Sequence, residues 1–585
     1  MKQITTLIIT LLALASSALA QHGMSVPPAP KIADADTRRA GDVLREFASQ
    51  LDLSPLDRAA VQTEGRIKSF DSMAHEIVGM ITGHQDVDGG GFNYDFLYLD
   101  MMIRPEIYQT ADIIYIKNKT MRLEFIKTLL GAAVPLEDAR QNTILKTGLV
   151  SESLLRHPAS IAFFESRRAD LIRTAKFVNQ IDSAVFLKNH AELGARLKLI
   201  PHPTNPDAPW FSVDALWEDN AQQGGLALTE SGFDTSLRSA LRTNWADFEK
   251  AWRNLDADAA NRALADFCAP LATINPAAYP STQKLSFESM YFKNKGFLWV
   301  WLVYLLASVF LLGGVIYKWK AARILGLSVF TIAFLLQTAA LLLRWYVSGR
   351  WPNSNMFEAV TTAFWFGALL AIGFELIARR SPMRNMFALT GAVGASCAIM
   401  AAKYIPQLDA NITNRMPVLN DIWLYIHTNV IIASYALIFM ASVTALLYLA
   451  RRFFTTDHAY ARAGGAAALL HASGADHHDA HKTTLSEVLD GATMILMELA
   501  FVMLWAGLIM GAIWADHSWG RPWGWDPKEV FALNTFLIFL ILVHVRLKVR
   551  DKGFWTAILA VAGCAVMLFN WIVINFIISG LHSYA

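Results

Sequence analysis

Four tryptophans lie within twelve residues, between two long apolar segments of this 585-residue chain. They are Trp514, Trp519, Trp523 and Trp525, and the last three stand among glycines, where the backbone can approach a flat partner closely. Anchoring at a membrane surface would explain one or two of them. The clustering of the others favours a large, planar and mostly apolar ligand such as a porphyrin.

Three histidines could ligate the iron of such a ligand. His427 lies at the start of one apolar segment and His582 follows the last one. Neutral imidazoles on opposite faces are a common axial pair for haem iron, although a single histidine at a membrane edge is often only a satisfied interfacial residue. His544 lies inside an apolar segment, where an ionisable group is either functional or hydrogen-bonded to a neighbouring helix.

Polar residues beside the apolar segments have structural as well as functional interpretations. The stretch 526–529 (DPKE) predicts a helix start with Asp526 as N-cap, which would also hold the tryptophan loop rigid. The stretch 355–358 (NMFE) predicts a second start of this kind. Arg344 and Arg350 could pair with haem propionates, or they could be ordinary flanking charges.

The elements that must position these residues are predicted to be membrane-spanning helices. Hydrophobic residues make up 54% of the chain, and eight stretches are long and apolar enough to span a bilayer. These are 296–317, 323–343, 357–378, 385–402, 425–449, 493–514, 530–548 and 555–579. Their connections carry fourteen lysines and arginines on one side and six on the other, so the tryptophan loop is predicted to lie on the outer side. We therefore expect an all-α polytopic membrane protein.

The first half of the chain has a different character. Residues 1–20 predict a signal peptide, with an uncleaved anchor as the alternative. Residues 21–295 mix polar and apolar positions and predict a mainly helical extracytoplasmic domain, with helices over 121–130 and 159–181. Residues 296–585 are predicted to form a transmembrane domain that handles haem, and the expected location is the bacterial cytoplasmic (inner) membrane, with the N-terminal domain and the C-terminus on the periplasmic side.

Composition excludes other classes of function. The net charge is only +2 and no basic stripe is present, so nucleic acid binding is not expected. The three cysteines are far apart and form neither CxxC nor CxxCH, so haem b would be held non-covalently. The histidine-rich stretch 471–481 could bind a metal, but its small residues favour a flexible linker.

Together these motifs resemble the CcsA (ResC) type cytochrome c biogenesis proteins, within the haem-handling group that carries a tryptophan-rich WWD signature. The matching stretches are WGRPWGWDPKEVFAL at 519–533, PNSNMFEAV at 352–360, VLNDIWLYIH at 418–427, LVHVR at 542–546 and GLHSY at 580–584. Their order along the chain is the family's order, and the combination is specific although no single stretch is.

The resemblance implies a haem site formed by the tryptophan loop, with Trp519, Trp523, Trp525 and Asp526. The two outer iron ligands are then His427 and His582. His544 is then a transmembrane ligand, and a partner of ResB (CcsB) type supplies the second transmembrane histidine. The implied activity is presentation of haem for thioether attachment to the CxxCH motif of apocytochrome c, as a component of a holocytochrome c synthase (haem lyase-type) complex. Catalysis would then be mostly positioning, and no residue is assigned a further catalytic role.

Three other functions are alternatives to this one. A haem exporter or chaperone would need the same ligands without the ligation step. A respiratory b-type cytochrome subunit would usually place paired histidines inside facing spans. An assembly scaffold would bind no haem and would show no Soret band.

Overall fold

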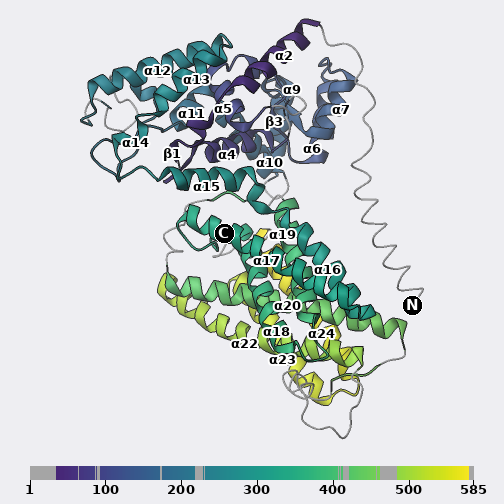
Figure 1. Cartoon of the computed structure of the whole chain (residues 1–585). Helices are drawn as coiled ribbons and strands as arrows, with labels where there is room; N and C mark the ends of the chain where they lie inside the picture. The colour runs from purple at the N-terminus through teal and green to yellow at the C-terminus, as the bar shows by residue number, and fades with distance from the viewer. Residues whose placement is uncertain are drawn as a thin grey trace.

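The computed structural model describes residues 35–63, 65–85, 87, 92–170, 174–217, 228, 231–405, 408, 410–412, 421–455, 458–461, 484–576 and 578. Figure 1 shows a helical N-terminal body and, below it, a bundle of long helices that begins at Val300. The predicted signal peptide, the histidine-rich stretch 471–481 and His582 lie outside the described residues.

The N-terminal body is mainly helical and contains two small antiparallel sheets, in which Ala60 pairs with Ser69 and Ile114 with Val150. Its elements are α2 (Ala35–Gln50), α3 (Ser54–Asp57), β1 (Ala60–Thr63), β2 (Arg66–Ser69), α4 (Phe70–Thr82), α5 (Tyr94–Ile103), η1 (Ile107–Gln109), β3 (Ile114–Tyr115), α6 (Lys119–Gly131), α7 (Asp138–Thr147), β4 (Leu149–Val150), α8 (Glu152–Leu155), α9 (Pro158–Arg168), α10 (Ala175–Leu187), α11 (His190–Arg196), η2 (Val213–Leu216), α12 (Thr235–Arg253), α13 (Ala257–Cys268), α14 (Leu271–Ile274), α15 (Thr282–Lys293) and η3 (Lys295–Phe297).

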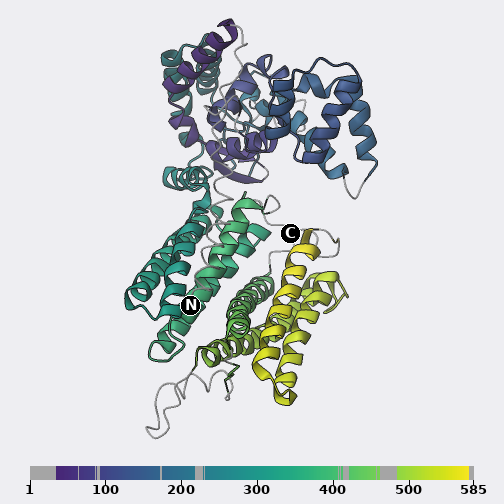
Figure 2. The same cartoon turned by 90° about the vertical axis from the view of Figure 1, so that its right-hand side faces the viewer.

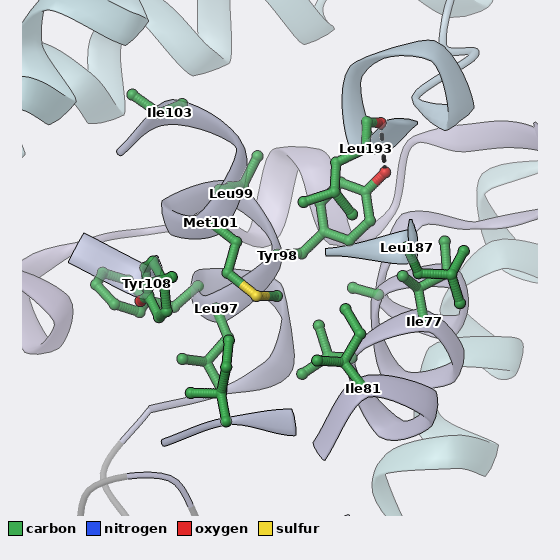
Figure 3. Close-up of a cluster of buried hydrophobic side chains, with 14 of the residues drawn as sticks. Ile77, Ile81, Leu97, Tyr98, Leu99, Met101, Ile103, Tyr108, Leu187 and Leu193 are labelled. Carbon is green, nitrogen blue, oxygen red and sulfur yellow. Dashed lines mark hydrogen bonds between the residues drawn. The ribbon is translucent and has the colours of Figure 1, made fainter. Parts of the chain in front are cut away.

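The core of this body is centred on α4 and α5. Figure 3 shows Ile77 and Ile81 of α4 facing Tyr98 of α5, whose hydroxyl donates to the carbonyl of Leu193 at 2.7 Å. Trp252 is fully buried and its indole N–H donates to the Asp100 carboxylate at 2.8 Å. A buried indole needs such a partner, so this tryptophan belongs to the core of the domain.

The expected helix over 121–130 is confirmed by α6, but the expected single helix over 159–181 is wrong. The chain leaves the helix after Arg168 and begins α10 at Ala175. The hydroxyl of Thr174 donates to the carbonyl of Arg167 at 2.5 Å. This local side-chain bond to a backbone acceptor competes with continued helical pairing.

The bundle confirms the eight predicted spans, because eight helices of the described residues are long and apolar enough to cross a membrane. They are α16 (Val300–Tyr317), α17 (Lys320–Ser348), α18 (Met356–Ala378), α19 (Met386–Tyr404), α20 (Ile422–Phe454), α22 (Leu485–Trp519), α23 (Pro527–Lys548) and α24 (Lys552–Phe569), and a π-helical turn, η5 (Asn570–Ile574), continues α24. The chain is therefore an all-α polytopic membrane protein.

Glycines weaken the hydropathy of α19 but explain its place in the bundle. A Cβ atom at Gly391 would lie 2.7 Å from the Cβ of Ala371, and one at Gly394 would lie 2.5 Å from the ring of Phe364. Both neighbours belong to α18. Small residues let two membrane helices approach closely, so α19 is an interior helix that packs on α18.

The two bodies meet at α15, which lies between them in Figure 1, and Figure 2 shows the N-terminal body against one end of the bundle. Arg66 of β2 pairs with Glu288 of α15 and donates to the carbonyl of Ile412, in the connection between α19 and α20, at 3.2 Å. Arg344 of α17 donates to the Tyr291 hydroxyl at 3.2 Å. The end of α17 and the described part of the connection between α19 and α20 therefore lie at the end of the bundle that contacts this body.

Three aspartates surround one lysine at this junction. Lys293 lies 3.0 Å from a carboxylate oxygen of Asp57 and 3.8 Å from one of Asp71. Burial, and then the charges of Asp71 and Asp57, raise the pKa of Asp95 well above its ordinary value. Burial also raises the pKa of Asp57, although Lys293 opposes the shift. The positive charge of Lys293 thus interacts with the carboxyl groups of Asp57, Asp71 and Asp95.

Candidate functional site

A cavity of about 240 Å³ lies among the helix ends that the sequence analysis singled out. Its wall comes from the start of α18, from α20, α22 and α23, from the tryptophan loop and from η5. The lining residues are Asn353, Ser354, Asn355, Met356, Ala359, Leu424, His427, Thr428, Ile431, Ile432, Tyr435, Leu508, Gly511, Ala512, Trp514, Ala515, Pro522, Trp523, Lys528, Glu529, Ala532, Asn570, Trp571 and Asn575. The wall is mostly apolar and aromatic, with a few polar groups, which is typical of ligand sites.

His427 reaches this cavity from the second turn of α20, and its ring is oriented by α22. Its Nδ1 lies 2.9 Å from the carbonyl oxygen of Gly507, so we assign the proton to Nδ1 and the lone pair to Nε2. The ring is nearly parallel to the indole of Trp514, at 11° and a centroid distance of 6.5 Å. A histidine held through one nitrogen presents the other in a defined direction, as metal-ligating histidines do.

Two glycines one turn apart on α22 allow it to approach α20 closely, and one of them, Gly511, leaves the space for this imidazole. A Cβ at Gly511 would lie 2.7 Å from Cε1 and 2.9 Å from Nδ1 of His427. A Cβ at Gly507 would lie 2.5 Å from Ile431 of α20. The pair forms a G-x-x-x-G pattern in an apolar segment, which marks a close helix approach. That pattern is the signal in the sequence for the contact between α20 and α22, and it was not among the motifs used above.

The four clustered tryptophans have different positions, and Trp514 and Trp519 belong to α22 while Trp523 and Trp525 lie in the loop that follows it. Trp514 and Trp523 line the cavity. Trp519 packs edge-on against Trp514, with ring centroids 4.8 Å apart. Trp525 is 73% exposed and touches Trp523 edge-on at 6.0 Å. Of the three tryptophans predicted with Asp526 to bind haem, Trp523 therefore lines the cavity, Trp519 packs against Trp514, and Trp525 lies on the surface.

Asp526 is the N-cap of α23, which confirms the predicted helix start. Its carboxylate accepts the backbone N–H of Lys528 at 3.2 Å, and the Glu529 carboxylate accepts those of Asp526 at 3.1 Å and Gly524 at 2.8 Å. Asp526 is 4% exposed and does not line the cavity. Its role in the structure is to fix the loop that carries Trp523.

Arg344 and Arg350 bind a carboxylate of the protein itself. Both make ion pairs with Glu358 of α18, at 2.8 Å and 2.7 Å. Arg344 also donates to the carbonyls of Ala410 at 2.7 Å and of Asn411 at 3.1 Å. The buried network holds the segment before α18, including the N-cap Asn355 that the sequence predicted, and this segment forms one edge of the cavity.

Asn570 of η5 and Asn575, which directly follows it, complete the wall, and neither was among the residues predicted from the sequence. The Asn570 amide donates to the Tyr435 hydroxyl at 2.9 Å, and Trp571 and Asn575 line the cavity beside them. An asparagine pair within an apolar segment, at 570 and 575, was the available signal, because amides in a membrane span need specific partners. A π-helical turn at this place is common at functional sites.

His544 lies apart from this cavity, exposed near the end of α23, and its Nδ1 is 2.9 Å from the Leu540 carbonyl oxygen. Within the described residues, no group of three or more His, Cys, Asp or Glu is arranged to hold a metal ion. The structure thus describes one of the two predicted outer ligands, and it does not bring the transmembrane histidine to the same site.

The part of the chain that contains the cavity is similar to a known protein family. Residues 353–582, which include the cavity wall, match the family described as Cytochrome C assembly protein. The chain is 31% identical over 258 residues to the cytochrome c biogenesis protein CcsA of Synechococcus sp. (strain CC9902), an alignment that covers 43% of this chain and 84% of the relative. A CcsA protein of Prochlorococcus marinus (strain MIT 9303) is 30% identical over 262 residues, 43% of this chain and 81% of that one.

A longer alignment, at 26% identity over 547 residues, relates 89% of this chain to 53% of the protein NrfI of Wolinella succinogenes. The chain therefore spans about half the length of NrfI, and an alignment this long includes most of the N-terminal body. This protein belongs to the CcsA family of cytochrome c biogenesis proteins, as the sequence motifs indicated.

Proposed function

We propose that this protein binds haem b at the described cavity and presents it on the outer face of the bacterial cytoplasmic membrane for thioether attachment to apocytochrome c. The observation that carries the proposal is the imidazole of His427. It is oriented by a backbone carbonyl, backed by an indole, and aimed into an aromatic cavity. His582 is the proposed second axial ligand.

Presentation of haem requires that the reacting edge of the porphyrin stays accessible at the cavity of about 240 Å³. Thioether formation needs such access. Each thiol adds across one vinyl group, so that a carbon–sulfur bond forms, the thiol hydrogen goes to the other vinyl carbon, and no net oxidation occurs. The protein then contributes mainly position.

We further propose that a partner of ResB (CcsB) type completes the protein. His544 is exposed on the bundle surface near the end of α23 opposite the cavity. A histidine from a neighbouring polypeptide could pair with it there. The N-terminal body contacts the same end of the bundle as the cavity, and we propose that it docks the partner or apocytochrome c.

The test is maturation of a reporter apocytochrome by the full chain in membranes, with and without a ResB-type partner. His427→Ala is expected to abolish maturation and to remove the low-spin haem spectrum of the purified protein. His517→Ala is the matched control, because His517 lies beside α20 at the same end but outside the cavity wall. Maturation by His427→Ala at normal protein levels would contradict the ligand assignment.

The same experiment separates the rival functions. A haem exporter would bind haem at this cavity and require another factor for ligation, whereas a b-type cytochrome subunit would be reduced rapidly by quinol. Maturation by the chain with its partner alone would support the synthase function.

A further inference from the structure

Two side chains that follow His427 in α20 are hydrogen-bonded to the segment before α18. The amide of Asn353 donates to the hydroxyl of Thr428 at 3.0 Å, and the indole N–H of Trp351 donates to the side-chain carbonyl of Asn429 at 3.0 Å. Thr428 and Asn429 are the next two residues after His427. The segment therefore binds α20 directly beside the proposed iron ligand.

Both acceptors are also bonded to the backbone of their own helix. The Thr428 hydroxyl donates to the carbonyl of Leu424 at 2.7 Å, and the Asn429 amide donates to the carbonyl of Tyr425 at 2.7 Å. A hydroxyl has one hydrogen, so Thr428 donates it to the helix and accepts from the segment. Each side chain thus joins the segment to the first two turns of α20, and the second of these turns carries His427.

The segment is fixed in turn by α18. The hydroxyl of Thr362 donates to the carbonyl of Pro352 at 2.9 Å, and the Glu358 carboxylate accepts the backbone N–H of Ser354 at 2.8 Å. Thr362 and Glu358 are fully buried. Breaking bonds to buried polar groups is costly, so the segment is a rigid support for the start of α20.

This support acts on a different part of the ligand from the contact with α22. The bond from His427 to the Gly507 carbonyl sets the direction of the ring, whereas the position of the ring also depends on the helix that carries it. A metal ligand must be placed within about 0.2 Å of its ideal distance, and such placement needs both kinds of restraint.

We propose that Trp351 and Asn353 are positioning residues for His427, which hold the second turn of α20 so that Nε2 meets the iron at bonding distance. The inference rests on the proposed function and adds to it the contacts that set the ligand geometry. Asn353 lines the cavity, whereas Trp351 is outside the described cavity wall, so an effect of Trp351 on the haem passes through α20. Loss of these bonds weakens the iron–nitrogen bond and converts part of the bound haem to the high-spin form.

The test is titration of the full-length protein in detergent with haem b, followed by visible absorption, which measures both the affinity and the low-spin fraction. Trp351→Phe keeps an aromatic ring but loses the N–H, so it is expected to lower the affinity roughly two- to tenfold and to weaken the low-spin bands. Asn353→Leu is expected to act in the same direction. Trp365→Phe is the matched control, because the Trp365 indole packs against that of Trp351 but donates to Thr338 of α17 at 2.9 Å.

Two substitutions at Thr428 test the same bond from the side of α20. Thr428→Val removes the hydroxyl at nearly constant volume and is expected to act like Asn353→Leu. Thr428→Ser keeps the hydroxyl and is expected to retain the native spectrum. A merely structural role of this residue would not make the low-spin fraction depend on the hydroxyl.

The outcomes separate the positioning role from the proposed function. Native affinity and a native low-spin fraction in both Trp351→Phe and Asn353→Leu overturn the positioning role while haem binding stands. An equal loss in Trp365→Phe also overturns it, because the effect would then be general. Failure of the native protein to bind haem, or a native spectrum in His427→Ala, overturns the proposed function itself.

Discussion

Replacing Gly511 with alanine tests whether the imidazole of His427 must occupy its present position. The added Cβ would lie 2.7 Å from Cε1, about 0.7 Å inside the 3.4 Å limit of ordinary contact. The helix α22 is packed against α20 through Gly507, so its backbone cannot move away easily. The ring must move instead, and it loses its bond to the Gly507 carbonyl or its direction into the cavity.

Overpacking of this kind costs about 1–3 kcal/mol, which corresponds to roughly a five- to 150-fold loss of haem affinity if the strain falls on the bound geometry. An iron–nitrogen bond tolerates displacements of only about 0.2 Å, so the low-spin spectrum should weaken as well. The assay is titration of the purified full-length protein with ferrous haem, followed by visible absorption. Gly313→Ala is the control, because nothing lies within 4 Å of a Cβ added there.

Thermal unfolding of the same samples separates a local effect from a general loss of stability. The reasoning would be refuted by a Gly511→Ala protein that binds haem with native affinity and a native spectrum. Such a result would show that His427 does not need this clearance to act as a ligand.

Three further predictions concern the supporting structure. Arg344→Met leaves Glu358 buried with one partner fewer, so thermal unfolding should show a loss of about 3–5 kcal/mol and haem titration a weaker site; native stability would contradict this. Asp526→Ala removes the cap of α23 and should lower the free energy of unfolding by about 1 kcal/mol, whereas Asp526→Ser should retain most of the native stability. Equal unfolding midpoints for the native protein and both variants would argue against a capping role. The raised pKa of Asp95 means that folding takes up a proton, so the stability it contributes is present at low pH and is lost as pH rises through the raised value. Asp95→Asn should therefore be more stable than the native protein at about pH 8 and equal to it at about pH 4, and a pH-independent difference would show that this carboxyl is not the cause.

Hydropathy and local capping chemistry predicted the elements of the membrane part. All eight spans were identified, because each is long and apolar enough to be recognised without knowledge of its neighbours. The caps at Asn355 and Asp526 were identified for the same reason, since a cap and its N3 partner lie within one turn. The break between α9 and α10 was missed, because a bond from Thr174 to Arg167 is invisible to a periodic pattern.

The sequence by itself determined the class of protein, the helices and the types of residue at the site. Only the tertiary structure decided which indoles face the cavity, because Trp523 and Trp525 are two residues apart and yet one lines the wall and the other is exposed. It also assigned Arg344 to Glu358, two residues on different helices, and brought η5 to a site formed mainly by distant segments. Such contacts depend on how helices pack against one another, and helix spacing along a chain does not specify that packing.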